Sequence, residues 1–224
     1  MKNNEELQRK VTNAIKWEPL LSSSEIEVTV EDGIVSLLGV VDSYAKKIEA
    51  ENAAKRVNGV RAVVEKIQVK LPDSWIKTNL EIEGQVLNAL KANWSVPDEK
   101  IVIKVEDGWI TLEGELPWNY QKEAAKNALN YLKGIRGVFN NIQIKPETHD
   151  NIEQKDVENA LNLSWSIDDS NIHVKVSGTT VVLTGTVNSW YQKEEAERIA
   201  WNTPGIRHIN NDLSIDSICL IADE

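Results

Sequence analysis

One pattern of eleven residues occurs three times in this 224-residue chain and constrains its fold more than any other feature. The copies lie at residues 29–39, 104–114 and 175–185, so they are 75 and 71 residues apart. Each copy alternates apolar with polar residues, passes a glycine-containing turn and closes on a glycine, as in the sequence KVEDGWITLEG of the second copy. Such alternation around a turn is typical of a β-hairpin. The ungapped repetition predicts three structural units of roughly 70 residues each.

The turn residues of the three hairpins are not the same. The dipeptides Asp32-Gly33 and Asp107-Gly108 suit the positive φ angles of a type I′ turn. The third copy has Ser177-Gly178-Thr179, which shifts the glycine by one position and predicts a different turn. We expect the second strand of each hairpin to end at the closing glycine, which is Gly39, Gly114 or Gly185.

Helical patterns flank each hairpin. Apolar residues precede the first hairpin at helical spacing, as at Leu7, Val11 and Ile15, and an alanine-rich helical stretch follows it, as at Ala50 and Ala53. An alternating apolar stretch then closes each unit. The sequence therefore predicts an α+β fold of three tandem α-β-β-α-β units, each with a three-stranded mixed sheet and two helices on one face.

Short proline-containing linkers separate the units. They place the predicted repeats at residues 1–72, 73–147 and 148–218, followed by a C-terminal tail at 219–224.

Charge excludes one broad class of partner. The net charge is −10, and it divides into −1, −1 and −8 over residues 1–73, 74–149 and 150–224. General nucleic-acid binding needs a basic surface, so no nucleic acid is expected as a partner. Attraction to an anionic membrane by charge is disfavoured as well. No stretch approaches the length of a transmembrane segment, and no secretory leader opens the chain, so the sequence as it stands predicts a cytoplasmic protein, or a periplasmic one if a leader has been removed.

The glycines and their neighbours resemble a known family. The features are the Glu-Asp-Gly hairpins, the strand glycines, and three later triplets, Gly59-Val60-Arg61, Gly134-Ile135-Arg136 and Gly205-Ile206-Arg207. Together with the α-β-β-α-β order, they resemble the BON domain, named for bacterial OsmY and nodulation proteins. The resemblance implies non-enzymatic binding modules linked to phospholipid interaction, envelope integrity and osmotic stress. Members also occur in secretins and in a cytoplasmic potassium-binding protein, and well-known tandem members are periplasmic.

Residues that could carry catalysis are scattered. His149, His173 and His208 have no serine or cysteine near them in a nucleophile motif. Cys219 has neither a CxxC partner nor zinc-ligand spacing. We therefore predict no enzymatic activity, no cofactor and no metal site.

Aromatic residues are the more informative group, since eight tryptophans accompany a single phenylalanine. Trp94 and Trp165, near the ends of the first helices of units two and three, are expected to cap the core. The candidate surface-binding residues are Trp109, Trp118, Tyr120, Trp190 and Tyr191. Tryptophan and tyrosine suit a bilayer interface or a protein surface, but the same residues could cover the edge of a small core or pack one repeat on the next.

The sheet argument predicts one uncovered face in each unit. It carries Glu27, Thr29, Ile34, Ser36 and Leu38 in unit one, and Val102, Lys104, Trp109, Thr111 and Glu113 in unit two. These faces are half apolar, so they could pack on one another or support self-association.

Three hypotheses of function follow. The first is a binding protein for osmotic or envelope stress that contacts a phospholipid surface or a protein. The second is a cytoplasmic sensor of a small ion, such as potassium, or of a small ligand. The third is an interaction scaffold.

Overall fold

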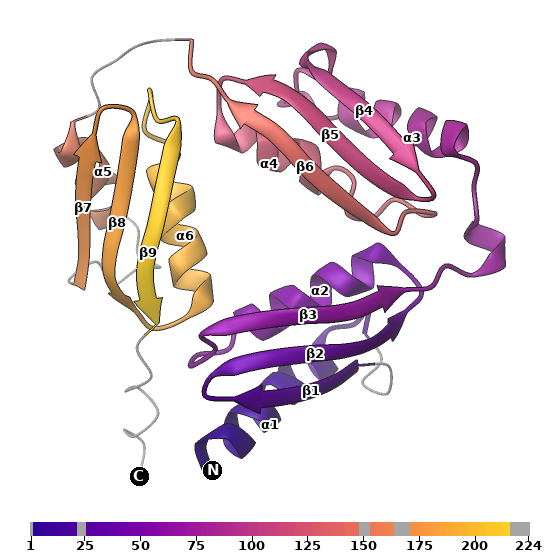
Figure 1. The fold of residues 1–224 in the computed structure, drawn as a ribbon, viewed down its shortest axis with the longest axis horizontal. Helices are drawn as coiled ribbons and strands as arrows, with labels where there is room; N and C mark the ends of the chain where they lie inside the picture. Colours follow the sequence, from indigo (N-terminus) through magenta and orange to yellow (C-terminus); the bar gives the residue numbers. More distant parts are fainter. Residues whose placement is uncertain (1, 22–25, 148–152, 164–170, 216–224) are drawn as a thin grey trace. The chain divides into compact units, whose positions relative to one another are not determined.

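The computed structural model describes residues 2–21, 26–147, 153–163 and 171–215 (Figure 1). The first repeat comprises α1 (Lys2–Trp17), β1 (Ile26–Glu31), β2 (Ile34–Val41), α2 (Tyr44–Lys55) and β3 (Ala62–Val69). The second comprises the short 3-10 helix η1 (Asp73–Trp75), α3 (Asn79–Ala92), η2 (Asp98–Lys100), β4 (Ile101–Glu106), β5 (Trp109–Leu116), α4 (Asn119–Asn127) and β6 (Gly137–Ile144). The third comprises α5 (Gln154–Asn162), β7 (Ile172–Ser177), β8 (Thr180–Val187), α6 (Trp190–Ala200) and β9 (His208–Ile215).

Each repeat contains a three-stranded sheet in sequence order. In the second repeat β4 and β5 are antiparallel, and β5 pairs in parallel with β6 through the α4 crossover. The third repeat has the same arrangement in β7, β8 and β9. Two helices lie behind the sheet of their own repeat in Figure 1. The predicted α+β fold of three α-β-β-α-β units with mixed sheets is confirmed.

The hairpin turns follow the sequence prediction. Both central residues of the first two turns have positive φ, with values of 48° at Asp32 and Asp107, 79° at Gly33 and 83° at Gly108. That combination is a type I′ turn. In the third hairpin the turn lies at Gly178-Thr179, and of these two only Gly178 has a positive φ, 60°. Glycine at the first central position fits a type II′ turn, so the third turn differs as expected.

The second strand of each hairpin is longer than predicted. Strands β2, β5 and β8 continue two residues past the glycine at which they were expected to end. Gly114 is paired with Ile101 and has a φ of 144°, and a Cβ there would lie 2.3 Å from the carbonyl oxygen of Lys100. The glycine is therefore needed because the backbone of the neighbouring strand comes too close for a side chain, and it does not end the strand.

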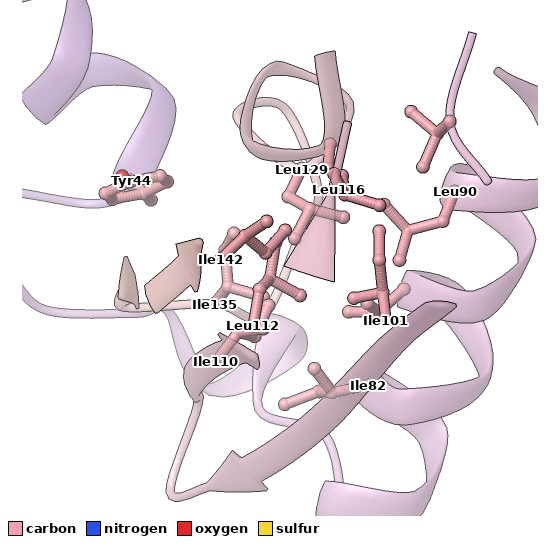
Figure 2. Close-up of a cluster of buried hydrophobic side chains, with 13 residues drawn as sticks. Tyr44, Ile82, Leu90, Ile101, Ile110, Leu112, Leu116, Leu129, Ile135 and Ile142 are labelled. Atoms are coloured by element: carbon pink, nitrogen blue, oxygen red, sulfur yellow. The ribbon is translucent and has the colours of Figure 1, made fainter. Parts of the chain in front are cut away.

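Buried side chains fill the space between helices and sheet. In the second repeat α3 contributes Ile82, Val86 and Leu90, and the sheet and α4 supply most of the rest of the cluster drawn in Figure 2. Residues 40–48 and 68–147 form one compact unit, and the other described residues form a second. Tyr44, at the start of α2, belongs to the unit formed by residues 40–48 and 68–147, and it is 4% exposed. No helix in the described ranges is long and apolar enough to cross a membrane.

Candidate binding surfaces

We call the face of each sheet that is turned away from its two helices the open face. In the second repeat, strand register fixes the neighbours on this face. Thr111 on β5 lies between Lys104 on β4 and Phe139 on β6. Trp109 and Glu113 are the next residues of β5 on the same face, two positions before and after Thr111. Trp109 lies beside Gly137 on β6, and Glu113 lies beside Val102 on β4.

The open face of the second repeat carries a pair of stacked aromatic rings. The ring centroids of Trp109 and Phe139 are 5.2 Å apart, and their planes differ by 18°. The Trp109 ring occupies the space where Gly137 has no side chain, since a Cβ on Gly137 would lie 2.3 Å from its Cζ3. Both rings remain exposed to solvent. Stacking and the missing Cβ together hold the indole against the sheet.

Two ion pairs lie on this side of the second repeat. Lys104 Nζ is 3.0 Å from Glu113, near the rings, and Lys145 Nζ is 2.6 Å from Glu115, further along β5. All four side chains are solvent-exposed, so each pair contributes little to stability, about 0–1 kcal/mol. The open face of the second repeat thus combines an aromatic pair with balanced charges.

The same framework presents different chemistry in the other repeats. Exposed aliphatic side chains occupy the open face of the first, namely Ile34, Leu38, Val40 and Val64. Polar and ionisable residues dominate that of the third, where the exposed positions include His173, Lys175, Thr184, His208 and Asn210. His173 faces away from the core, because it alternates with the apolar residues of β7.

A second group of aromatics lies where the hairpin meets the following helix. The rings of Trp118 and Tyr120 are 6.4 Å apart between centroids, with Trp118 half-buried and Tyr120 exposed. In the third repeat Trp190 packs against the buried cluster, and its Nε1 donates a 2.9 Å hydrogen bond to Glu194. Tyr191 beside it is exposed. Trp190 therefore covers the edge of the core, whereas the two tyrosines are available to solvent.

Among the described residues, the most exposed large apolar side chains lie at the ends of the first helices. Trp17, the last residue of α1, is 85% exposed, and Leu163, at the end of α5, is 86% exposed. Trp94, two residues beyond α3, is 93% exposed. The expectation that Trp94 caps the core is wrong, and Trp165 lies outside the described residues. The Asn93 side chain accepts hydrogen bonds from the amide and the hydroxyl of Ser95, and the resulting turn buries Val96 in place of Trp94.

Comparison with known proteins fits this threefold architecture. The sequence model of the BON domain matches residues 3–70, 78–146 and 149–217, which together make up most of the chain. The chain belongs to the BON domain family. The three matches fall within the three predicted repeats, whose own boundaries stay predictions.

Relatives of this BON protein include the osmotically-inducible protein Y of Escherichia coli (strain K12). The two sequences are 28% identical over 144 residues, which cover 61% of this chain and 70% of the relative. Among solved structures, two of CdsD, a structural protein of the type III secretion system of Chlamydia trachomatis, are 19% and 18% identical. They cover 94% of this chain and 97% or 92% of their own, with TM-scores of 0.24 and 0.26, at which no structural conclusion follows.

The five aromatic candidates thus fall into separate places on the BON repeats. Trp109 pairs with Phe139, Trp118 pairs with Tyr120, and Trp190 and Tyr191 begin α6. Their role in binding stays a prediction. Phe139 was missed, although its outward position on the last strand of the unit is visible in the alternation of residues 137–144.

Within the described ranges, no group of three or more His, Cys, Asp or Glu side chains is placed to hold a metal ion. His149 and Cys219, two of the residues weighed in the sequence, lie outside those ranges.

Proposed function

We propose that this BON protein is a non-enzymatic protein of osmotic or envelope stress that attaches to phospholipid surfaces through apolar side chains at the ends of the first helices. The observation that carries the proposal is the near-complete exposure of Trp17, Trp94 and Leu163 at closely similar places in the three repeats. The stress setting is supported by the BON match and by the relative in Escherichia coli.

Such exposure has a measurable energetic consequence. Burying an aromatic side chain removes about 150–250 Å² from water, which at about 25 cal/mol per Å² stabilises by about 4–6 kcal/mol. Insertion into the headgroup region buries part of that area. The indole ring also keeps its N–H near water at this depth, which is why tryptophan is enriched at membrane interfaces. Two or three shallow anchors would give reversible attachment.

Charge sets the kind of lipid surface. The chain carries a net charge of −10, so an anionic bilayer repels it while a zwitterionic bilayer does not. We therefore expect binding to zwitterionic vesicles to equal or exceed binding to anionic ones. Added salt screens the repulsion, so it should reduce the difference in binding between zwitterionic and anionic vesicles.

Flotation with phosphatidylcholine vesicles tests the proposal, with a parallel series containing phosphatidylglycerol. We expect the full chain to float with the former. Trp94→Ser and Trp17→Ser should each reduce the floated fraction, and the double variant should abolish it. Leu80→Ser is the matched control, because Leu80 is also exposed but lies at the opposite end of α3 from Trp94. Absence of wild-type binding, or equal loss in Leu80→Ser, would overturn the proposal.

A further inference from the structure

The open face of the second repeat has a charge pattern that is complementary to itself. Lys104 on β4 and Glu113 on β5 are diagonal neighbours. Lys104 is paired with Thr111, and Glu113 is two residues further along β5 on the same face. Their charged atoms are 3.0 Å apart, and both side chains are exposed. A second copy of the same face, turned over by a two-fold rotation, could place its glutamate over this lysine and its lysine over this glutamate.

Strand register fixes what such a rotation brings together. Adjacent strands are about 4.8 Å apart, and alternate residues of one strand are about 6.8 Å apart. On a sheet taken as flat over three strands, the axis that exchanges Lys104 and Glu113 passes within about 2 Å of the Cα of Phe139. Phe139 would therefore pack against its own counterpart. Trp109 and Asn141 lie about 7 Å to either side of the axis, so the indole would meet the amide.

We propose that a second copy of this chain docks on the open face of the second repeat in this two-fold arrangement. The charges favour this occupant, because the same rotation matches both halves of the ion pair and places the exposed Phe139 of the edge strand β6 close to the axis. Exposed aromatic residues beside polar and charged ones are a common composition of protein interfaces. The strands of the two copies would cross closer to perpendicular than parallel, near one of the two arrangements known for packed sheets.

The open faces of the other repeats lack this combination. The first has exposed aliphatic residues, and the third is mainly polar. The proposal concerns the second repeat alone, and it does not depend on lipid binding.

Charge reversal in the full chain tests the arrangement. The wild-type chain should form a dimer in analytical ultracentrifugation over a concentration series. Lys104→Glu and Glu113→Lys should each raise the dimer Kd about tenfold or more. In either variant, both contacts between position 104 of one copy and position 113 of the other join like charges. Mixing the two variants should restore dimerisation, since every crossed pair is then Lys with Glu. Neither substitution should unfold the chain, because exposed ion pairs contribute little.

Two further variants make the test specific. Lys91→Glu reverses an exposed charge at the end of α3, in the helix layer, and should leave the dimer intact. In a Cys219→Ser background, Phe139→Cys should form a cross-linked dimer with a short bis-maleimide, since two packed sheets lie about 10 Å apart. Tyr131→Cys, exposed elsewhere in the repeat, should not. A wild-type chain that stays monomeric at every concentration, or mixed variants that stay monomeric, would overturn the proposal.

Discussion

The six-membered ring of Trp109 lies against the Cα of Gly137, so close that a Cβ on that glycine would meet Cζ3 at 2.3 Å. Gly137 begins β6 and is paired with Trp109 across the parallel ladder. Its φ is outside the left-handed region, so the backbone does not require glycine there. The missing side chain instead makes room for the indole, which then stacks on Phe139.

Substituting Gly137→Ala should therefore move Trp109 without unfolding the repeat. The displaced ring loses a stacking interaction of about 0.5–1.5 kcal/mol. Replacing glycine by alanine also stabilises the folded state by about 0.4–1 kcal/mol, because the unfolded chain has less conformational entropy. We expect little net change in the free energy of unfolding and a clear shift of the Trp109 indole N–H signal in the NMR spectrum. An unshifted indole signal would contradict the packing.

The matched control is Gly84→Ala. Gly84 lies within α3, and a Cβ added there would meet nothing within 4 Å. We expect this substitution to raise the free energy of unfolding by about 0.5–1 kcal/mol through helix propensity and to leave the Trp109 signal in place.

Gly114→Ala should be far more damaging than Gly137→Ala. Gly114 has a φ of 144°, and its Cβ would lie 2.3 Å from the Lys100 carbonyl oxygen, a backbone atom that cannot rotate away. Strain of this kind costs about 2–4 kcal/mol. Urea unfolding measures this loss of stability. Gly185→Ala should also lower the free energy of unfolding, because its Cβ would approach the Asn171 carbonyl oxygen. A loss below about 1 kcal/mol in both variants would refute this account.

Periodicity and repetition were enough to predict the fold. Apolar alternation fixed the inward side of the strands, and the Asp-Gly dipeptides predicted turns whose φ angles the structure confirms. The strand ends were misplaced because a glycine was read as a stop. At Gly114 it is required by the approach of a neighbouring backbone, which a linear pattern does not record.

The candidate surfaces were harder to predict, because they depend on three-dimensional detail. Trp94 follows a helix in a position that could face either way, and the turn formed by Asn93 and Ser95 decides that it faces solvent. Phe139 belongs to the surface around Trp109 only through the register between β5 and β6, which are separated in sequence by α4. Trp190 begins the helix that follows the third hairpin, but whether its ring faces solvent or core depends on its packing.

Asn140 ties the last strand of the second repeat to its second helix, and its removal should lower stability. Its side-chain Nδ2 donates a 2.9 Å hydrogen bond to the carbonyl oxygen of Lys122, and Asn211 makes the equivalent 2.8 Å bond to Lys193 in the third repeat. We expect Asn140→Ala to lower the free energy of unfolding by about 1–2 kcal/mol, because the carbonyl loses a partly buried partner.

Asn141→Ala is the control for this prediction, since the neighbouring side chain is exposed and should change stability by less than about 0.5 kcal/mol. Chemical denaturation of both variants makes the comparison. Equal losses of stability in Asn140→Ala and Asn141→Ala would show that the hydrogen bond from Asn140 to the Lys122 carbonyl oxygen does not stabilise the repeat.

The start of α3 should make stability depend on pH in a defined direction. Thr78 and Glu81 form a capping box, in which the Thr78 hydroxyl accepts from the Glu81 amide and the Glu81 carboxylate accepts from the Thr78 amide at 2.8 Å. The hydrogen bond from the Thr78 amide, followed by that from its hydroxyl, lowers the pKa of Glu81. The folded state therefore holds this proton less tightly than the unfolded state does.

Stability contributed by Glu81 is consequently present above the pKa of the unfolded chain and is lost as pH falls through the lower pKa of the folded chain. We expect Glu81→Gln to flatten the acid side of a plot of unfolding free energy against pH. In an NMR titration, Thr78→Ala should move the pKa of Glu81 part of the way back toward its ordinary value, because it removes the hydroxyl donor and keeps the amide donor, whereas Thr78→Ser should hold the pKa low. If Thr78→Ala leaves that titration unchanged, the hydroxyl does not contribute to the shift.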